Sequence, residues 1–256
     1  MKTRMGLVCA AVLGMVAAMG PQGTSAAEIK VLTTGAFKQV VVALVPQFEK
    51  ATGHKVVVDN GTVGQLTRRV DGGETFDVLV LSPKGIDNLI GQGRIVAGSS
   101  AKLAKVGVGV MVKAGARKPD VGTVEAFKQA LLQARSVGYI DPASGGSSGI
   151  YVSGLLDRLG IADRIKPKAR LKRGGHVSDL VIGGEADIGI HQMSEIVSQP
   201  GVSLVGPLPA PIQNYTTYAV GLAADTRQGE AARAFIRLLT GPEAAAVLRT
   251  KGMEPA

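Results

Sequence analysis

Cysteine and tryptophan are nearly missing from this sequence of 256 residues, which has a single cysteine, Cys9, and no tryptophan. Cys9 lies in an N-terminal segment that we expect to be removed, so the mature chain would have no disulfide, no thiolate metal site and no cysteine nucleophile. Aromatic residues make up only 4% of the chain. Because sugar rings usually stack on the flat faces of aromatic side chains, this scarcity argues against a carbohydrate ligand.

A long apolar span is also missing, and the N-terminus instead has the three parts of an export signal. Lys2 and Arg4 precede an uncharged, mostly apolar run from Met5 to Gly20, and small residues follow up to Ala27. A transmembrane helix needs roughly 20 consecutive apolar residues, and this run is shorter. We therefore expect residues 1–27 to be a signal peptide that is cleaved near Ala27, which would release the rest of the chain into the periplasm.

Basic residues outnumber acidic ones, but they form no long run. Without Lys2 and Arg4, 27 of the 29 basic residues remain against 20 acidic ones, a formal charge of +7. They occur in small groups with few aromatics nearby, so we expect no nucleic-acid partner and favour a small anionic ligand. No His, Asp or Glu cluster has metal-ligand spacing and no glycine-rich loop has the phosphate-cradling pattern, so we expect neither a metal nor a cofactor.

Strand-like and helix-like segments alternate along the mature chain. Short runs rich in β-branched residues predict strands, and apolar residues recurring every three or four positions predict helices. The expected strands are 29–33, 55–59, 77–81, 106–113, 136–140, 186–191 and 216–223. The expected helices are 37–52, 65–71, 87–92, 124–134, 149–159, 176–183, 228–240 and 242–251, with residues 141–148 as a loop. This order predicts an α/β protein with parallel strands.

The strands and helices fall into two sets, which predicts two lobes, each a central sheet flanked by helices. We expect lobe 1 to contain residues 28–109 and 216–256, and lobe 2 to contain residues 110–215. Ligands of open α/β sheets bind beyond the carboxyl ends of the strands, and two lobes would bring two such edges face to face. A monomer of this kind would hold its ligand between the lobes.

Three strand-to-helix turns have the composition of an anion site, namely residues 34–36, 61–64 and 147–150. In such a turn, free backbone N–H groups point out of a helix N-terminus that carries partial positive charge. Glycine lets an anion approach the backbone, and Ser or Thr hydroxyls add donors. The alternative is ordinary helix capping, the usual role of Ser or Thr before a helix. Three such turns in one basic chain favour a shared anion site.

Five segments occur together in a characteristic order: Val31–Phe37, Gly61–Val70, Phe76–Ser82, Asp141–Tyr151 and Glu185–Ile190. In order and spacing they resemble the periplasmic molybdate-binding proteins, which are extracellular solute-binding proteins with the type 2 fold. The resemblance extends over essentially all of the mature chain. It implies a two-lobed fold that closes over a small anion and delivers it to an ABC-type transporter in the membrane.

The resemblance also implies which residues bind the ligand. Together with the turn chemistry, it indicates Thr34, Gly35, Ala36, Phe37, Thr62, Val63, Gly64, Ser147, Ser148, Gly149, Ile150, Val177 and Gln192. Three positions depart from the family pattern, because Ala36 replaces a serine, Thr62–Gly64 replaces a serine-rich turn and Gln192 replaces a tyrosine. The lost hydroxyls favour an anion other than molybdate, such as an organic carboxylate.

One branch of the same superfamily contains enzymes, the aconitate isomerases, so an isomerase of unsaturated tricarboxylates is the alternative function. Its reaction needs a base that removes a proton next to a carboxylate. His176 and His191 are the candidate catalytic residues, with Glu195 as a further candidate, while His54 is expected to face solvent. A structural role is the alternative for both candidate histidines. Binding without catalysis is the leading hypothesis.

Overall fold

The computed structural model describes residues 26–256, so nearly all of the expected signal peptide lies outside the described residues. The strands are β1 (Glu28–Thr34), β2 (Lys55–Gly61), β3 (Val78–Leu81), β4 (Ala101–Lys113), β5 (Val137–Ile140), β6 (Ala169–Lys172), β7 (Ile188–Gln192), β8 (Val202–Pro207), β9 (Tyr215–Leu222) and β10 (Glu254–Pro255). The helices are α1 (Gly35–Thr52), α2 (Val63–Asp71), α3 (Pro83–Gly91), α4 (Val124–Gln133), α5 (Ser147–Arg158), α6 (Ala162–Ile165), α7 (Ser178–Ile182), α8 (Met193–Val197), α9 (Gly229–Leu239) and α10 (Pro242–Thr250). In this part of the chain, no helix is long and apolar enough to cross a membrane.

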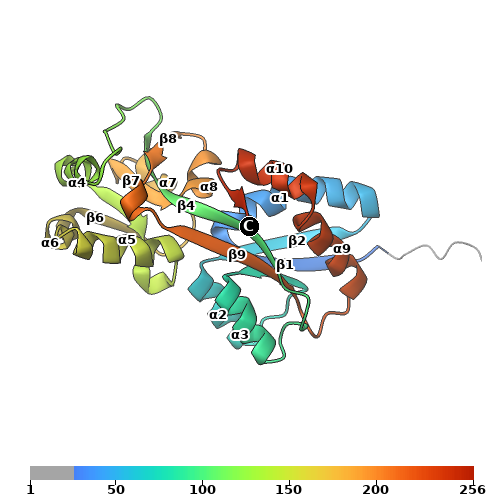
Figure 1. Cartoon of the computed structure of the whole chain (residues 1–256). Coiled ribbons are helices and arrows are strands. Elements are labelled where there is room, and N and C mark those ends of the chain that lie inside the picture. The colour runs from blue at the N-terminus through green and yellow to red at the C-terminus, as the bar shows by residue number, and fades with distance from the viewer. Residues whose placement is uncertain (1–25) are drawn as a thin grey trace, which may run out of the picture.

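The sheet has two sections that meet in the long strand β4 (Figure 1). The strand order is β2-β1-β3-β9-β4-β7-β5-β6, and β8 and β10 also pair with β4. Residues 101–107 of β4 pair with β9, whereas residues 108–113 pair with β7 and β8. We call residues 28–107 and 215–256 the terminal half, because it contains both ends of the described chain, and residues 108–214 the middle half.

Parallel pairing dominates the outer parts of the sheet, and antiparallel pairing its centre. Strands β1, β2 and β3 are parallel in the terminal half, and β5, β6 and β7 are parallel in the middle half. Strand β9 runs antiparallel to both β3 and β4. Helices flank the sheet, so the predicted α/β class is confirmed. The predicted lobe boundaries near residues 110 and 215 stay a prediction.

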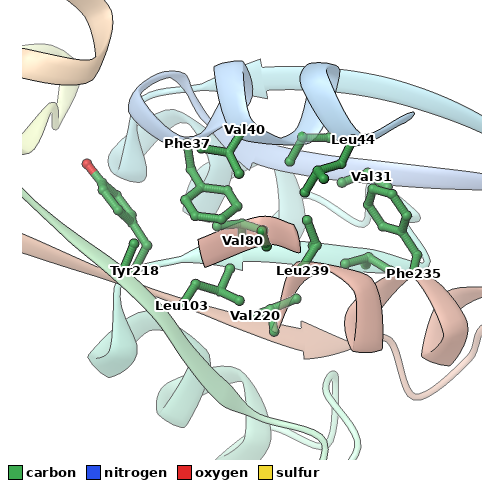
Figure 2. Packing of buried hydrophobic residues seen from close by; sticks show 14 of the residues in the cluster. Val31, Phe37, Val40, Leu44, Val80, Leu103, Tyr218, Val220, Phe235 and Leu239 are labelled. Carbon is green, nitrogen blue, oxygen red and sulfur yellow. The ribbon is translucent and has the colours of Figure 1, made fainter. Parts of the chain in front are cut away.

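Helix α1 shows how the sequence builds the core of the terminal half. Its apolar residues recur every three or four positions, which places them on one face, and they are buried: Phe37, Val40, Val41, Leu44 and Phe48. They pack against the sheet and against α9, as Figure 2 shows for Phe37, Val40 and Leu44. Phe48 and Phe235 meet edge to face at 5.0 Å between ring centroids. The helix ends where Gly53 adopts a left-handed conformation, φ 73°, which costs glycine little. The middle half has its own buried cluster around Phe127.

Three helices begin two residues earlier than the sequence indicates. Helices α1, α2 and α5 start at Gly35, Val63 and Ser147, and the residue before each has an extended backbone. The turn residues therefore belong to the first helical turns, whose N–H groups have no partner within the helix. This shift brings the expected anion-binding residues onto helix N-termini.

Other expected elements also differ in extent. Helix α3 starts at Pro83 instead of 87, because proline is favoured in a first helical turn and the Ser82 hydroxyl accepts a hydrogen bond from the Gly85 N–H (3.2 Å). Strand β4 starts at 101 instead of 106, and α7 is shorter than the expected helix at 176–183. The short elements β6, β8, β10, α6 and α8 were not expected, because two to six residues carry too little periodicity to distinguish them.

His54, expected to face solvent, is instead partly buried and has partners. Its Nδ1 accepts a hydrogen bond from the backbone N–H of Ala27 (3.1 Å), and its ring lies 6.0 Å from that of Phe48. The solvent-facing expectation is wrong, because β1 begins beside the end of α1 and brings Ala27 within reach.

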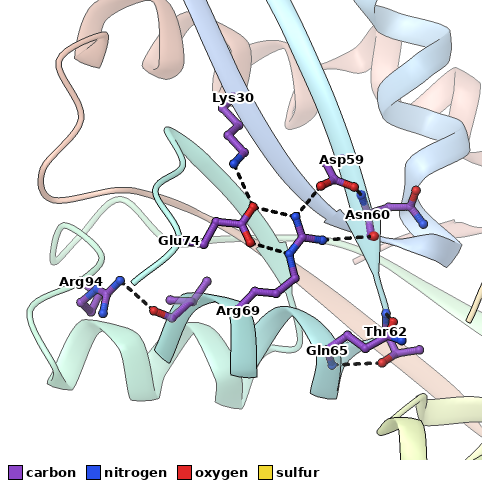
Figure 3. A network of polar contacts seen from close by, with 9 residues as sticks. Lys30, Asp59, Asn60, Thr62, Gln65, Arg69, Glu74 and Arg94 are labelled. Atoms are coloured by element: carbon purple, nitrogen blue, oxygen red, sulfur yellow. Dashed lines mark hydrogen bonds and ion pairs between the residues drawn. The ribbon is translucent and has the colours of Figure 1, made fainter. Parts of the chain in front are cut away.

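Helix α2 is held against the sheet by a network of charges (Figure 3). The Arg69 guanidinium donates to both carboxylate oxygens of Glu74 (2.5 and 2.6 Å) and to Asp59, while Lys30 donates to Glu74 (2.8 Å). Hydrogen bonds from Arg69 and Lys30 lower the pKa of Glu74 to about 2. Arg69 is therefore engaged in structure and is not available to attract a ligand.

Candidate functional site

A small pocket lies at the carboxyl ends of four strands from both halves. Strands β1, β2, β5 and β7 end there at Thr34, Gly61, Ile140 and Gln192. The pocket has a volume of about 50 Å³. It is lined by Thr34, Gly35, Ala36, Asn60, Gly61, Thr62, Val63, Ile140, Gly146, Ser147, Ser148, Gly175, His176, His191, Gln192, Glu195 and Tyr218. This is where open α/β sheets bind ligands.

The N-termini of three long helices converge on this pocket. Residues of the first turns of α1, α2 and α5 line it, together with the residue before each helix. No side chain caps α1 or α5, so their first N–H groups are not taken up by a capping residue. Uncapped N–H groups and the helix dipole both favour a negative ligand.

Helix α2 differs, because a side chain does cap it. The Thr62 hydroxyl accepts from the Gln65 N–H (3.1 Å), and the Gln65 side chain accepts from the Thr62 N–H (2.8 Å), which is a capping box. The same hydroxyl donates to the Ser144 carbonyl (2.6 Å) in the middle half. Thr62 lines the pocket, but its hydroxyl is already used for capping and for contact between the halves.

Hydrogen bonds to backbone carbonyls hold the two halves together beside the pocket. The Gly64 N–H donates to the Gly145 carbonyl (3.1 Å), and the Gln65 amide donates to the Arg173 carbonyl (2.8 Å). A methyl group on Gly64 would lie 2.8 Å from the Gly145 Cα, closer than side chains approach backbone atoms. The two halves are therefore in direct backbone contact, which two facing glycines allow.

Several pocket side chains have buried polar atoms without a partner among the described residues. They are Thr34 Oγ1, His191 Nε2 and Gln192 Oε1. The other end of the Gln192 amide donates to Thr216 Oγ1 (2.8 Å). Because an unsatisfied buried polar group costs roughly 1–3 kcal/mol, three of them around one pocket indicate a place for a polar ligand.

His191 and Glu195 form a buried pair at the base of the pocket. Their side chains are 4% and 6% exposed, and His191 Nδ1 lies 3.2 Å from Glu195 Oε2. Burial lowers the pKa of His191 and raises the pKa of Glu195 to about 8. At neutral pH both groups are uncharged, so the pair adds no negative charge to the pocket.

His176 and Tyr218 complete the titratable lining. Burial lowers the pKa of the half-buried His176, although Asp179 opposes this effect. Tyr218 packs its ring 6.3 Å from that of Phe37 and points its hydroxyl away from the apolar cluster (Figure 2). Burial and the nearby Glu195 carboxyl raise the pKa of Tyr218. Its phenol is therefore a neutral hydroxyl in the pocket.

The structure brings most of the expected site residues to this one pocket. Those that line it are Thr34, Gly35, Ala36, Thr62, Val63, Ser147, Ser148 and Gln192, and the candidate catalytic residues His176, His191 and Glu195 line it as well. Their roles in binding or catalysis stay predictions.

Five expected site residues do not line the pocket. The side chains of Phe37 and Val177 are fully buried in apolar clusters, and Ile150 is 55% exposed on the outer side of α5. Gly64 packs on Gly145, and Gly149 packs so closely on Ile140 that a methyl group would lie 2.2 Å from its carbonyl oxygen. The helical rotation of about 100° per residue turns the side chains of Phe37 and Ile150 away from the pocket, while Gly64 and Gly149 are taken up by close backbone packing.

Sequence reasoning missed Asn60, Ile140, Gly146, Gly175 and Tyr218 as pocket residues. Asn60 and Ile140 could have been found, since each lies at the carboxyl end of a strand. Tyr218 lies in the middle of β9, where no sequence signal distinguishes a pocket residue from a core residue.

The arrangement defines a class of protein: an α/β protein with a small polar pocket between two sections of sheet. The chain belongs to the bacterial extracellular solute-binding protein family, whose model matches residues 29–254. The predicted type 2 solute-binding family and the solute-binding function are thus confirmed, and the family indicates a location outside the cytoplasm.

Two known proteins and one solved structure are similar to this chain. It is 31% identical to an aconitate isomerase of a Pseudomonas species over 233 residues, 89% of this chain and 87% of that protein. It is 27% identical to the molybdate-binding protein ModA of Azotobacter vinelandii, over 89% of this chain and 90% of that protein. The solved structure of the Azotobacter vinelandii periplasmic molybdate-binding protein superposes with a TM-score of 0.73 at 22% identity, covering 88% of this chain and 98% of that chain.

Proposed function

We propose that the protein captures a small anion, either a compact oxyanion or an organic carboxylate, between two lobes and delivers it to an ABC-type transporter. One observation carries this proposal: uncapped N-termini of α1 and α5 surround a pocket in which Thr34 Oγ1 and His191 Nε2 have no partner. Export to the periplasm, cleavage near Ala27 and a monomeric state are parts of the same proposal. The two lobes close by bending where β4 changes partners from β9 to β7 and β8.

The charge and size of the pocket support a small anion. With Glu195 neutral, no ionised acidic group lines the pocket, and the helix N-termini supply partial positive charge. A water molecule needs about 10–15 Å³ of such space, so the closed pocket of about 50 Å³ suits a compact ligand. A larger carboxylate requires the lobes to close less completely.

A panel of anions tests the proposal. Residues 28–256 would be mixed separately with molybdate, tungstate, sulfate, phosphate, and di- and tricarboxylates, and the melting temperature measured at constant ionic strength. A ligand at a hundred times its Kd stabilises the folded state by about 2.7 kcal/mol, which for this chain length raises the melting temperature by roughly 5–10 °C. Chloride is the control. If no anion in the panel raises the melting temperature, the proposal is wrong.

Isomerisation of an unsaturated tricarboxylate is a second candidate function of the same pocket. It is favoured by the placement of His176, His191 and Glu195, three groups able to transfer protons, around one ligand site. The similarity to an aconitate isomerase supports it. Incubation with trans-aconitate, followed by proton NMR, tests this candidate: appearance of the cis isomer supports it, and an unchanged spectrum eliminates it.

A further inference from the structure

Glu195 is an unusual residue for an anion pocket, because its side chain lies against the N-terminus of α1. It comes from α8, whose Ser194 hydroxyl donates to the Ala36 carbonyl (2.8 Å) and fixes α8 on α1. One carboxyl oxygen, Oε1, lies where a methyl group on Gly35 would approach it to 2.7 Å. An ionised carboxylate there would occupy the position that best attracts an anion.

The hydrogen bonds around His191 show where the protons of the pair are. His191 Nδ1 accepts from the backbone N–H of Gln192 (2.7 Å), so it carries no proton itself. Glu195 Oε2 is 3.2 Å from the same nitrogen. Two groups that both lack a proton would repel at this distance, so the carboxyl carries the proton. The imidazole proton is then on Nε2, which is buried without a protein partner.

We propose that Glu195 is a specificity-determining residue that must be protonated for an anion to bind. In its neutral form it adds no charge beside Gly35, and the Nε2–H of the imidazole remains a donor to the anion. When Glu195 ionises, it places a negative charge beside Gly35 and repels the ligand. The effect of Glu195 on anion binding rests on the proposed function, whereas the positions of the protons rest on the geometry alone.

Burial favours the neutral form of Glu195, against the partial positive charge of the α1 N-terminus. No cation faces it within the pocket, whose other titratable groups are His176, His191 and Tyr218. Helix α8 packs against α1, β4, β7 and β8, and β8 has no titratable side chain. The remaining charges of these elements are Lys38, Glu49 and Lys50 on α1 and Lys102, Lys105 and Lys113 on β4. Lys105 is paired with Glu254, and the charge of Lys38 acts on His176.

This role couples binding to pH in a definite direction. Burial raises the pKa of Glu195 to about 8, so the binding-competent neutral form predominates below that pH and is lost as the pH rises through it. If only the neutral form binds, affinity falls about tenfold for each pH unit above the pKa.

The proton positions are tested first, without any ligand. The ¹⁵N shifts of histidine-labelled protein distinguish a protonated from an unprotonated imidazole nitrogen, and His191→Gln identifies the signal by its loss. A proton on Nε2 alone at pH 7 supports the proposal. A proton on Nδ1, or on both nitrogens, overturns it, and the pair would then be a base or an ion pair. The chain has three histidines, so His54→Gln and His176→Gln identify the His191 signal by elimination if His191→Gln fails to fold.

The pH profile then tests the effect on binding. Kd would be measured for molybdate, sulfate and succinate, whose charges stay constant over neutral and alkaline pH. Wild type should lose affinity above about pH 8, whereas Glu195→Gln should bind equally at both ends of the range. The matched control Glu185→Gln, an exposed residue, should keep the wild-type profile. A flat wild-type profile, or a fall that persists in Glu195→Gln, overturns the proposal. If none of the three anions binds, the proposed function is contradicted for them, and the NMR result still stands.

Discussion

At the residue scale, Gly35 is the position where α1 approaches the buried carboxyl of Glu195. A side chain there would lie 2.7 Å from Glu195 Oε1, so even a methyl group forces the carboxyl to move. The residue is glycine for lack of space and not for an unusual backbone angle, since its φ is not positive. The sequence predicted Gly35 as a ligand-binding residue, but only the structure explains why it lacks a side chain.

Gly35→Ala should therefore weaken both anion binding and the fold. We expect at least a tenfold loss of affinity, because the displaced carboxyl disturbs His191, and about 1–3 kcal/mol of destabilisation from overpacking. Calorimetry and denaturant unfolding measure the two effects. Gly91→Ala on α3 is the control, since a methyl group there meets nothing within 4 Å. Unchanged affinity in Gly35→Ala would contradict the expectation.

Thr34→Val tests the unpartnered hydroxyl of the pocket. Valine has nearly the same shape as threonine but no hydroxyl, so we expect a loss of one ligand hydrogen bond, about 1 kcal/mol or roughly fivefold in Kd. The folded state should be as stable or slightly more stable, because Thr34 Oγ1 is unsatisfied without ligand. Thr52→Val, at the far end of α1, should leave Kd unchanged. A Kd equal to wild type in both variants would show that Thr34 Oγ1 does not contact the anion.

At the element scale, the helices that carry the pocket were predictable in kind but not in extent. Apolar residues recurring every three or four positions indicated that α1 is a helix. A continuous apolar run indicated that β3 is a buried strand. The starts of α1, α2 and α5 were misplaced by two residues, because the glycines and serines among the missed residues are typical of turns. Helix α8, which supplies Glu195, has five residues and left no detectable period.

The charge network on α2 gives an element-scale prediction about acid stability. The pKa of Glu74 is lowered from 4.5 to about 2, so its stabilising effect is present above about pH 4.5 and is lost as the pH falls toward 2. Because both Arg69 and Glu74 are partly exposed, Glu74→Gln should destabilise the fold at pH 7 by only about 1 kcal/mol.

Urea unfolding of Glu74→Gln and wild type between pH 7 and pH 2 measures this effect. The difference between them should shrink as the pH falls, since protonation removes the same charge from wild type. Glu28→Gln is the control, because Glu28 makes no ion pair among the described residues. A difference that stays constant down to pH 2 would mean that the Glu74 charge contributes nothing.

At the scale of the whole molecule, closure depends on the backbone contact between Gly64 and Gly145. Any side chain at either position meets backbone atoms that cannot move aside, because a methyl group would lie 2.8 or 2.6 Å from the facing Cα. Gly64→Ala should therefore hold the two halves apart while each half keeps its own core. We expect at least a tenfold lower affinity for the anion and a larger radius of gyration with ligand present.

Small-angle scattering with and without the anion measures this change of shape. The control is Gly154→Ala within α5, where the nearest atom belongs to the flexible side chain of Arg158 at 3.4 Å, and which should stabilise the helix by about 0.5–1 kcal/mol. If Gly64→Ala compacts with ligand as wild type does, the glycine contact does not govern closure.

The sequence by itself determined the α/β alternation, the turns that place helix N-termini at strand ends, and the basic balance that favours an anion. Each of these depends on neighbouring residues or on composition, so a linear pattern is enough to reveal it. Only the tertiary structure decided which side chains meet: Glu195 with Gly35, Tyr218 with the pocket, and Gly64 with Gly145. These pairs come from segments far apart in the chain, and their contacts follow from how the two sections of sheet pack, for which a local pattern carries no signal.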